Sequence, residues 1–134
     1  MANEGITLPA SAQQILVQMQ TFQQQYQAVA MQRESLSVQR LEVEKALEEL
    51  EKLKDSDEVY KAVGPILVKS TRMNLVKEMK ERKEVIDVKL KSVNAQEETI
   101  RKKLGEAEVK LKGMIDQGKR ETRQNVKDGG SAAE

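Results

Sequence analysis

Two long stretches of the chain repeat apolar residues at alternating steps of three and four. In the first stretch only two positions of the repeat are charged, and its members are Ile15, Met19, Phe22, Tyr26, Val29, Arg33, Leu36, Arg40, Val43, Leu47 and Leu50. The second stretch contains Val76, Met79, Lys83, Ile86, Leu90, Val93, Glu97, Ile100, Leu104, Ala107, Leu111 and Met114. So narrow a repeat is typical of a coiled-coil seam, since a helix packed on a globular core has a wider apolar stripe.

These repeats predict a helix over residues 10–53 and a second helix over residues 71–118. Either Ser70 or Thr71 could cap the second helix, because both side chains can accept a hydrogen bond from a free backbone N–H. The two seams are nearly equal in length, so we expect the helices to pack as an antiparallel pair. Residues 119–134 contain a Gly-Gly-Ser run near their end and are predicted to form a flexible C-terminal tail.

The segment between the helices has a different pattern. Residues 57–70 are rich in β-forming residues on both sides of Gly64 and Pro65, which predicts a β-hairpin with a type II′ turn. A lone two-stranded hairpin is marginally stable and has open edges. We therefore expect hairpins from several chains to join in an oligomeric β-barrel, through Val59, Tyr60, Val63, Ile66, Leu67 and Val68. The alternative is a simple hairpin that closes a monomeric or dimeric coiled coil.

Composition argues against catalysis. The 134 residues suit one domain and include no cysteine and no histidine, which removes the usual thiolate and imidazole ligands and nucleophile systems. Paired carboxylates such as Glu48 and Glu49 lie on a predicted exposed helix with no pocket to shift their pKa. We expect no enzymatic activity, no catalytic residue, no metal site and no cofactor.

Charge and hydropathy bound the partners and the location. Charged residues form 34 % of the chain but the net charge is +1, so no overall field favours nucleic acid or an anionic membrane surface. The start of the sequence has no basic region of the kind found in signal peptides, and no apolar run approaches the roughly 20 residues of a membrane span. We expect a cytoplasmic protein that binds neither nucleic acid nor membrane.

The segment Glu58-Val59-Tyr60-Lys61-Ala62-Val63-Gly64-Pro65-Ile66-Leu67-Val68-Lys69 resembles the central motif of β-class prefoldin subunits of the archaeal type. The Gln-rich stretch 23–27, the stretch 45–50 and the stretch 94–98 also fit, and the resemblance extends from about Ala10 to Gly118. It implies a single prefoldin-like domain over 1–118, mainly α, in which a long antiparallel two-helix coiled coil carries the central hairpin.

The resemblance also implies a function. Prefoldins are ATP-independent cytosolic chaperones in which two α-class and four β-class subunits form a hexamer. Their hairpins make a double barrel from which the coiled coils extend. The tips of the coils hold unfolded polypeptides and deliver them to a group II chaperonin. The expected partners are therefore α-class subunits, further β copies, unfolded polypeptides and the chaperonin.

The predicted tip is unusual because no residue from Gly5 to Gln32 is charged. Its candidate client-binding residues are Ile6, Leu8, Ile15, Leu16, Val17, Met19, Leu111, Met114 and Ile115. Four of these, Ile15, Met19, Leu111 and Met114, fall in the seam, where a role in the coiled-coil core is favoured. The other five are expected to contact clients, because exposed apolar residues on a charged protein indicate a binding surface.

The charged seam positions and the protein class each leave an alternative open. Glu97 could pair with Arg33 across the seam, but we favour long stems with solvated charges at all four charged seam positions. The alternative to a chaperone is a structural coiled-coil scaffold or tether. The hairpin discriminates the two, because a scaffold arm has no need of a strand motif between its helices.

Overall fold

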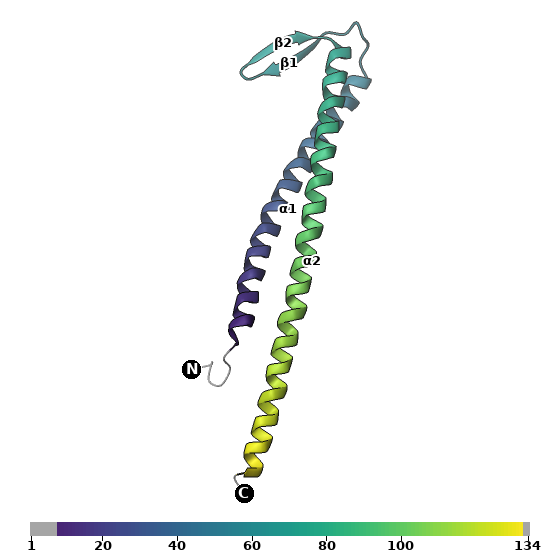
Figure 1. Cartoon of the computed structure of the whole chain (residues 1–134). Helices are drawn as coiled ribbons and strands as arrows, with labels where there is room; N and C mark the ends of the chain where they lie inside the picture. The colour runs from purple at the N-terminus through teal and green to yellow at the C-terminus, as the bar shows by residue number, and fades with distance from the viewer. Residues whose placement is uncertain (1–7, 133–134) are drawn as a thin grey trace. The chain divides into compact units, whose positions relative to one another are not determined.

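The computed structural model describes residues 8–132, with side chains to residue 118. Its elements in order are α1 (Ala10–Glu51), β1 (Val59–Val63), β2 (Ile66–Ser70) and α2 (Arg72–Ala132) (Figure 1). The two strands follow α1 and precede α2 in the chain, and they pair with each other in antiparallel register. The predicted class, two long helices with a central β-hairpin, is confirmed.

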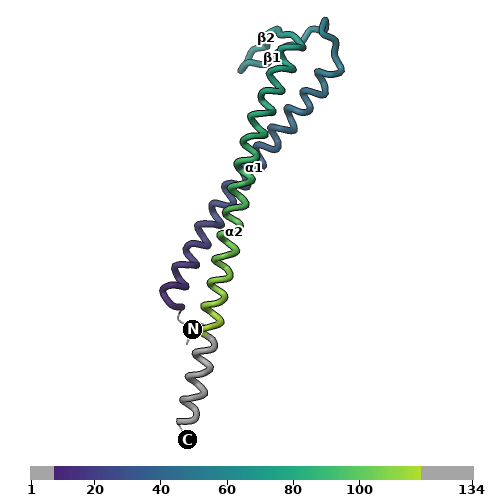
Figure 2. Tube along the Cα trace, turned by 45° about the vertical axis from the view of Figure 1, so that its right-hand side comes forward, coloured from purple at the N-terminus to yellow at the C-terminus, as the bar shows by residue number. Residues whose placement is uncertain are grey.

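The chain divides into two compact units, and both helices contribute to each. Unit 1 contains Met1–Ala28 and Glu97–Glu134, and unit 2 contains Val29–Gln96. Within each unit a segment of α1 lies beside a segment of α2 (Figures 1 and 2). Contacts between the two helices show that these segments are antiparallel. Residues further along α1 contact residues that come earlier in α2. In unit 2, for example, Arg40 meets Asp87 and Glu44 meets Lys83.

The core of unit 2 is made by seam residues. Leu36 and Val43 of α1 and Ile86 and Val93 of α2 are all buried. Next to the hairpin, Leu50, Val59 and Leu75 form a buried cluster against which Val76 and Met79 pack. The base of β1 therefore shares a core with both helix ends, which ties the hairpin to the coiled coil.

The core of unit 1 is smaller. Ala12, Ile15 and Ala107 are buried. Ala12 precedes Ile15 by three residues, so it extends the seam one step before its predicted start. Two alanines fill little volume, and the helix backbones can approach closely where they pack.

Glu97 corrects a prediction made from the sequence, because its charge is not solvated. The residue is 4 % exposed. Its Oε1 accepts a hydrogen bond from the Tyr26 hydroxyl at 3.0 Å and one from Arg101 Nη2 at 3.3 Å. A buried carboxylate costs free energy unless it is paired and hydrogen-bonded, and these partners meet that need. The alternative left open from the sequence, an ion pair between Glu97 and Arg33, stays a prediction.

Arg101 completes this polar group from the surface. Its Nη2 also lies 3.4 Å from the Tyr26 hydroxyl oxygen. The hydrogen bond with Tyr26, together with the negative charges of Glu97 and Glu98, raises the pKa of Arg101 above its ordinary value. The guanidinium is thus a permanent cation beside the buried carboxylate.

Arg40 and Lys83, two charged seam positions of unit 2, behave as expected for long stems with solvated heads. Arg40 Nε lies 3.0 Å from Asp87 Oδ1 and 3.3 Å from Glu44 Oε1, and Lys83 Nζ lies 3.8 Å from Glu44 Oε1. These side chains are between 36 and 44 % exposed. Solvent-exposed ion pairs typically contribute only about 0–1 kcal/mol each to stability. Because they form only when these residues lie opposite one another, they also favour the observed antiparallel register.

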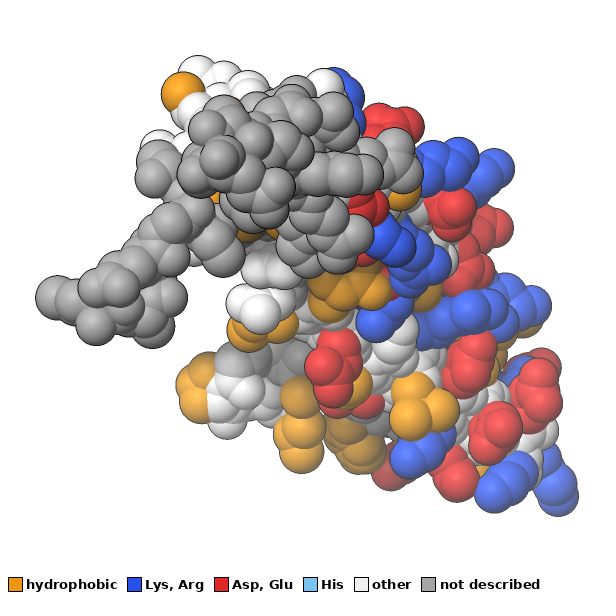
Figure 3. Space-filling view, turned by 90° about the horizontal axis from the view of Figure 1, so that it is seen from below, with side chains coloured by type: hydrophobic (Ala, Val, Ile, Leu, Met, Phe, Trp, Pro, Cys, Tyr) orange, Lys and Arg blue, Asp and Glu red, His pale blue; other side chains and the backbone are white. Residues whose placement is uncertain are grey.

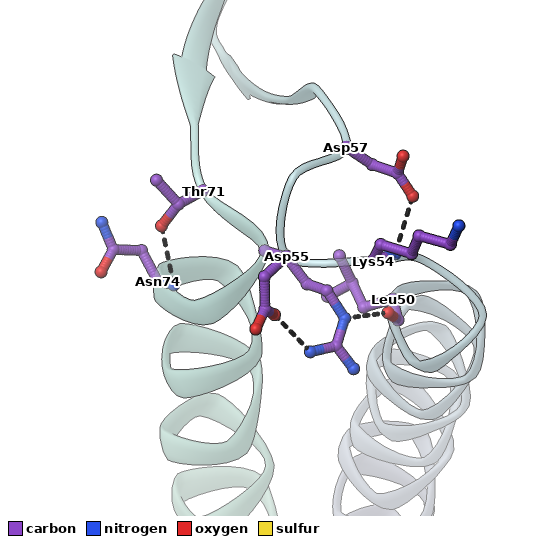
Figure 4. Close-up of polar contacts among 7 residues, drawn as sticks. Leu50, Lys54, Asp55, Asp57, Thr71 and Asn74 are labelled. Carbon is purple, nitrogen blue, oxygen red and sulfur yellow. Dashed lines mark hydrogen bonds and ion pairs between the residues drawn. The ribbon is translucent and has the colours of Figure 1, made fainter.

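The first helix ends two residues before its predicted end. Lys52 N and Leu53 N bond to carbonyls three residues back, which tightens the last turn and stops the α-helix at Glu51. The Lys54 N–H then donates to Asp57 Oδ2 at 2.7 Å (Figure 4). The strands occupy 59–63 and 66–70 within the predicted hairpin segment.

The second helix is capped by Thr71, one of the two predicted candidates. Thr71 Oγ1 accepts a hydrogen bond from the Asn74 N–H at 3.1 Å (Figure 4), and the helix begins at Arg72. It continues to Ala132, so the predicted end at Gly118 is wrong. Gly118 lacks the positive φ that terminates many helices at glycine, and good helix formers follow it. Residues 119–134 were predicted to form a flexible tail, and that flexibility stays a prediction.

Arg72 connects the start of α2 to the end of α1. Its Nε donates to the Leu50 carbonyl at 2.6 Å, and its Nη1 lies 2.9 Å from Asp55 Oδ1. The Leu50 carbonyl is one of the last four of α1, and it also accepts the Leu53 N–H at 3.2 Å, so Arg72 supplies its second hydrogen bond. In Figure 4, the dashed lines that end at Leu50 and at Asp55 mark these two contacts. Arg72 thereby fixes the chain on both sides of the hairpin.

We expect Arg72→Ala to lower the free energy of unfolding by about 1–2 kcal/mol, because the substitution removes a charged donor from a helix carbonyl. Urea denaturation followed by circular dichroism measures the change. Arg82→Ala is the matched control, since Arg82 is an exposed residue of the same helix. Equal stability of the two variants would show that the junction does not depend on Arg72.

We expect Tyr26→Phe to lower the free energy of unfolding by about 1–2 kcal/mol, because it takes one hydrogen bond from the buried Glu97 carboxylate. The same denaturation measurement applies. The control is Tyr60→Phe, which removes a hydrogen bond from the Tyr60 hydroxyl to Glu58 Oε2, both on exposed residues. A loss no larger than that of the control would contradict the stabilising role of the Tyr26 hydroxyl.

Candidate functional site

The turn of the hairpin has the geometry that its sequence demands. Val63 pairs with Ile66, so Gly64 and Pro65 form a two-residue loop. Gly64 has a φ of 58°, a value that residues with a Cβ adopt only with strain. Proline holds its own φ near −65°, so a glycine-first, proline-second turn fits type II′ and excludes type I′. The turn fixes the register of the strands.

The apolar side chains of the hairpin are mostly exposed. Val59 is the exception at 7 %, because it packs against the helix ends. The other predicted oligomerisation residues are between 44 and 73 % exposed, with the largest value at Leu67: they are Tyr60, Val63, Ile66, Leu67 and Val68. A row of exposed branched side chains at one place is costly in water and indicates a surface that another chain covers.

Both faces of the hairpin carry such side chains. Alternation along the strands and the observed register place Val63, Ile66 and Val68 on one face, and Tyr60 and Leu67 on the other. The first face also bears Lys61, whose Nζ lies 2.8 Å from Glu78 Oε2 of α2. That ion pair and the buried base of β1 hold the hairpin, while both faces remain accessible.

The hairpin also leaves hydrogen-bonding capacity on its edges. The sheet of the described residues contains β1 and β2 and no further strand. In an antiparallel pair, every second residue of each strand directs its N–H and C=O away from its partner. Two free edges and two apolar faces together form a surface suited to strand pairing with other chains.

The predicted client-binding residues of the described part all belong to unit 1, but they differ in exposure. Ile15 is buried, as a seam position should be, and Leu8, Met19, Leu111 and Met114 are half-buried. Leu16 and Ile115 are 37 % and 36 % exposed and Val17 is 61 % exposed, as expected for positions outside the seam. Ile6 lies outside the described residues. Their contact with clients stays a prediction.

Further exposed apolar residues were not singled out from the sequence. They lie outside both the seam repeat and the predicted tip, and they are Met31, Val38 and Leu41 on α1 and Met73, Val85, Val88 and Val109 on α2. Most stand among charged neighbours in the sequence. Figure 3 shows positive and negative side chains intermixed over much of the charged surface. Isolated exposed apolar residues in such surroundings are ordinary.

Metal-binding and membrane-spanning features were considered among the described residues of the chain. No group of three or more acidic side chains there is arranged to hold a metal ion. Neither described helix has a segment both long and apolar enough to cross a membrane.

Comparison with known proteins is consistent across sequence and structure. The family model described as Prefoldin subunit matches residues 13–118. A prefoldin subunit beta of Archaeoglobus fulgidus is 41 % identical over 108 residues, which cover 81 % of this chain and 93 % of that protein. The one of Methanococcoides burtonii is 42 % identical over 105 residues, which cover 78 % and 90 %.

A solved structure agrees with these relatives. The crystal structure of the prefoldin beta subunit from Thermococcus strain KS-1 matches with a TM-score of 0.76 at 36 % identity, covering 80 % of this chain and 94 % of that one. Prefoldin subunits are non-enzymatic chaperone subunits, which agrees with the expectation that this chain has no catalytic activity. The chain therefore belongs to the prefoldin family, as a chaperone subunit of its beta class.

Proposed function

We propose that this chain is a subunit of an ATP-independent holdase that captures unfolded polypeptides at its coiled-coil tips and delivers them to a group II chaperonin in the cytoplasm. The observation that carries the proposal is the exposure of Leu16, Val17 and Ile115 in unit 1, beside a helix segment without charge. Such a surface offers apolar contact to a non-native chain and repels no client by its charge.

The hairpin supports assembly with other prefoldin subunits. Its free edges can accept strands from neighbouring hairpins, and its two apolar faces can be buried in a closed sheet. The proposed complex contains two α-class and four β-class subunits, with the hairpins joined in an oligomeric β-barrel. Val59 and the Lys61–Glu78 ion pair hold the base of each hairpin to its own helices while the remainder joins the barrel.

Assembly also explains how a weak site becomes useful. Leu16, Val17 and Ile115 are each only partly exposed, so one subunit gains little free energy from covering them. Several tips that act on the same unfolded chain raise the effective concentration of binding sites without any new type of contact. Weak individual contacts also allow the client to leave for the chaperonin.

We expect Leu67→Lys to block assembly, because the substitution places a charge on the most exposed apolar position of the hairpin, which the proposed barrel would bury. Light scattering on the chain mixed with an α-class partner should show smaller species. The control is Val88→Lys, an equally drastic change at a 69 % exposed helix position. A full-size complex from the Leu67→Lys chain would contradict the barrel.

The holdase proposal is tested by the aggregation of a chemically unfolded model protein, with and without the assembled complex and in the absence of ATP. We expect suppression at a modest molar excess, and we expect Leu16→Glu with Ile115→Glu to reduce it several-fold by charging the apolar surface. The matched control combines Leu41→Glu and Val85→Glu, which charge positions of 51 % and 53 % exposure in unit 2.

The outcomes separate the alternatives. A complex of full size that does not suppress aggregation would favour a structural scaffold over a holdase. If the parent suppresses aggregation and both charged variants do so equally well, the client surface lies elsewhere on the chain. A loss confined to the Leu16 and Ile115 variant would support the proposed surface.

A further inference from the structure

A second heptad-like row follows α1 on the face away from the seam. It consists of Gln13, Val17, Gln20, Gln24 and Gln27, and we call these five residues the neutral stripe. Their steps alternate four and three, so all five stay on one face of the helix over about 21 Å. Every member is exposed, and all belong to unit 1.

The stripe shares its neutral chemistry with the other exposed residues of α1 before Arg33, and this segment differs from the surface of α2 and of the remainder of α1. Elsewhere the exposed helix positions are dominated by Lys, Arg, Glu and Asp, whereas α1 carries no charge before Arg33. Gln13 Nε2 donates to the Leu8 carbonyl at 3.2 Å. Within the part of the chain that the structure describes, the side chains of Gln20, Gln24 and Gln27 form no hydrogen bond. Their amides are therefore available to a partner.

We propose that the neutral stripe binds the backbone of unfolded polypeptide segments, irrespective of the charge those segments carry. This inference rests on the proposed holdase function and names the feature of the client that is recognised. A glutamine amide offers two donors and one acceptor, which complement the C=O and N–H of any peptide unit. An unfolded chain exposes these groups along its whole length, whereas a folded protein has most of them paired.

The absence of charge and the scarcity of apolar residues on the stripe distinguish this occupant from others. Nucleic acid needs cations, and the stripe has none. A helix of a second copy needs apolar residues at the repeating positions of the row, and only Val17 among the five is apolar. A neutral segment with unpaired backbone groups fits the stripe, and the adjacent Leu16 adds apolar contact.

The test measures peptide binding by the full complex with its α-class partner. The probes are three unstructured fluorescent peptides with the same Leu, Val, Gly and Ser content, which carry three Glu, three Lys or neither. We expect Kd values within about threefold of one another, and about the same values at low and high salt, because no charge pair forms at the stripe.

Variants then introduce the missing charge. The triple substitution Gln20→Glu, Gln24→Glu and Gln27→Glu should weaken binding of the anionic peptide about tenfold and strengthen that of the cationic one. The corresponding triple change to Lys should reverse this preference. The control adds the same charges in unit 2, through Ser37→Glu, Ser92→Glu and Gln96→Glu, which are all exposed positions. This control variant should bind the three peptides with the same Kd values as the parent.

Each result decides between named alternatives. If the parent suppresses aggregation but selects peptides strongly by charge, or if both stripe variants bind all three peptides as the parent does, this inference is overturned and the holdase proposal stands. If the parent complex self-associates and both stripe variants abolish that association, the stripe binds a second copy of the complex. That result would also overturn this inference. A parent complex that neither binds the peptides nor suppresses aggregation overturns both proposals.

Discussion

A pair of helices has one seam to bury, and this limit governs the rest of the structure. The seam positions of α1 and α2 form the cores of both units, and the small residues Ala12 and Ala107 leave unit 1 with little buried volume. No second layer covers the outer faces of the described helices or either face of the hairpin. Such a protein keeps most of its apolar and polar surface available, and assembly with other prefoldin subunits can cover part of it.

The hairpin is fixed to its own helices at its base and is exposed over the rest of its length. Its base is held by Val59 in the shared cluster, by the pair of Lys61 with Glu78, and by the bonds of Arg72 to the end of α1. These contacts fix where the strands start without covering their edges. The proposed pairing with other hairpins needs one fixed register and open edges, and a buried base with an exposed remainder is compatible with both.

Sequence patterns predicted the features that depend on spacing. The alternating repeat gave the helices and most seam positions, and Gly64 with Pro65 gave the turn, because these signals reside in neighbouring residues. The burial of Glu97 depends on Tyr26, which is distant in sequence, and the tie of Arg72 to Leu50 joins opposite sides of the hairpin. The end of α2 was also missed, since a glycine stops a helix only where the chain adopts positive φ.

Charge is distributed unevenly along α1, and the polar contacts with α2 differ between the two units to match. In unit 2 the register is supported by ion pairs such as Arg40 with Asp87, which typically contribute about 0–1 kcal/mol each and would be lost in a shifted pairing. In unit 1 the α1 segment has no charge, and its polar link to α2 is made by the neutral hydroxyl of Tyr26 to the buried Glu97. A hydroxyl that specifies the seam from within leaves the outer surface of α1 free of charge. A fixed register and an uncharged outer surface, which we propose as the binding face, are thus compatible on one helix, because the register contact is buried and the outer surface is exposed.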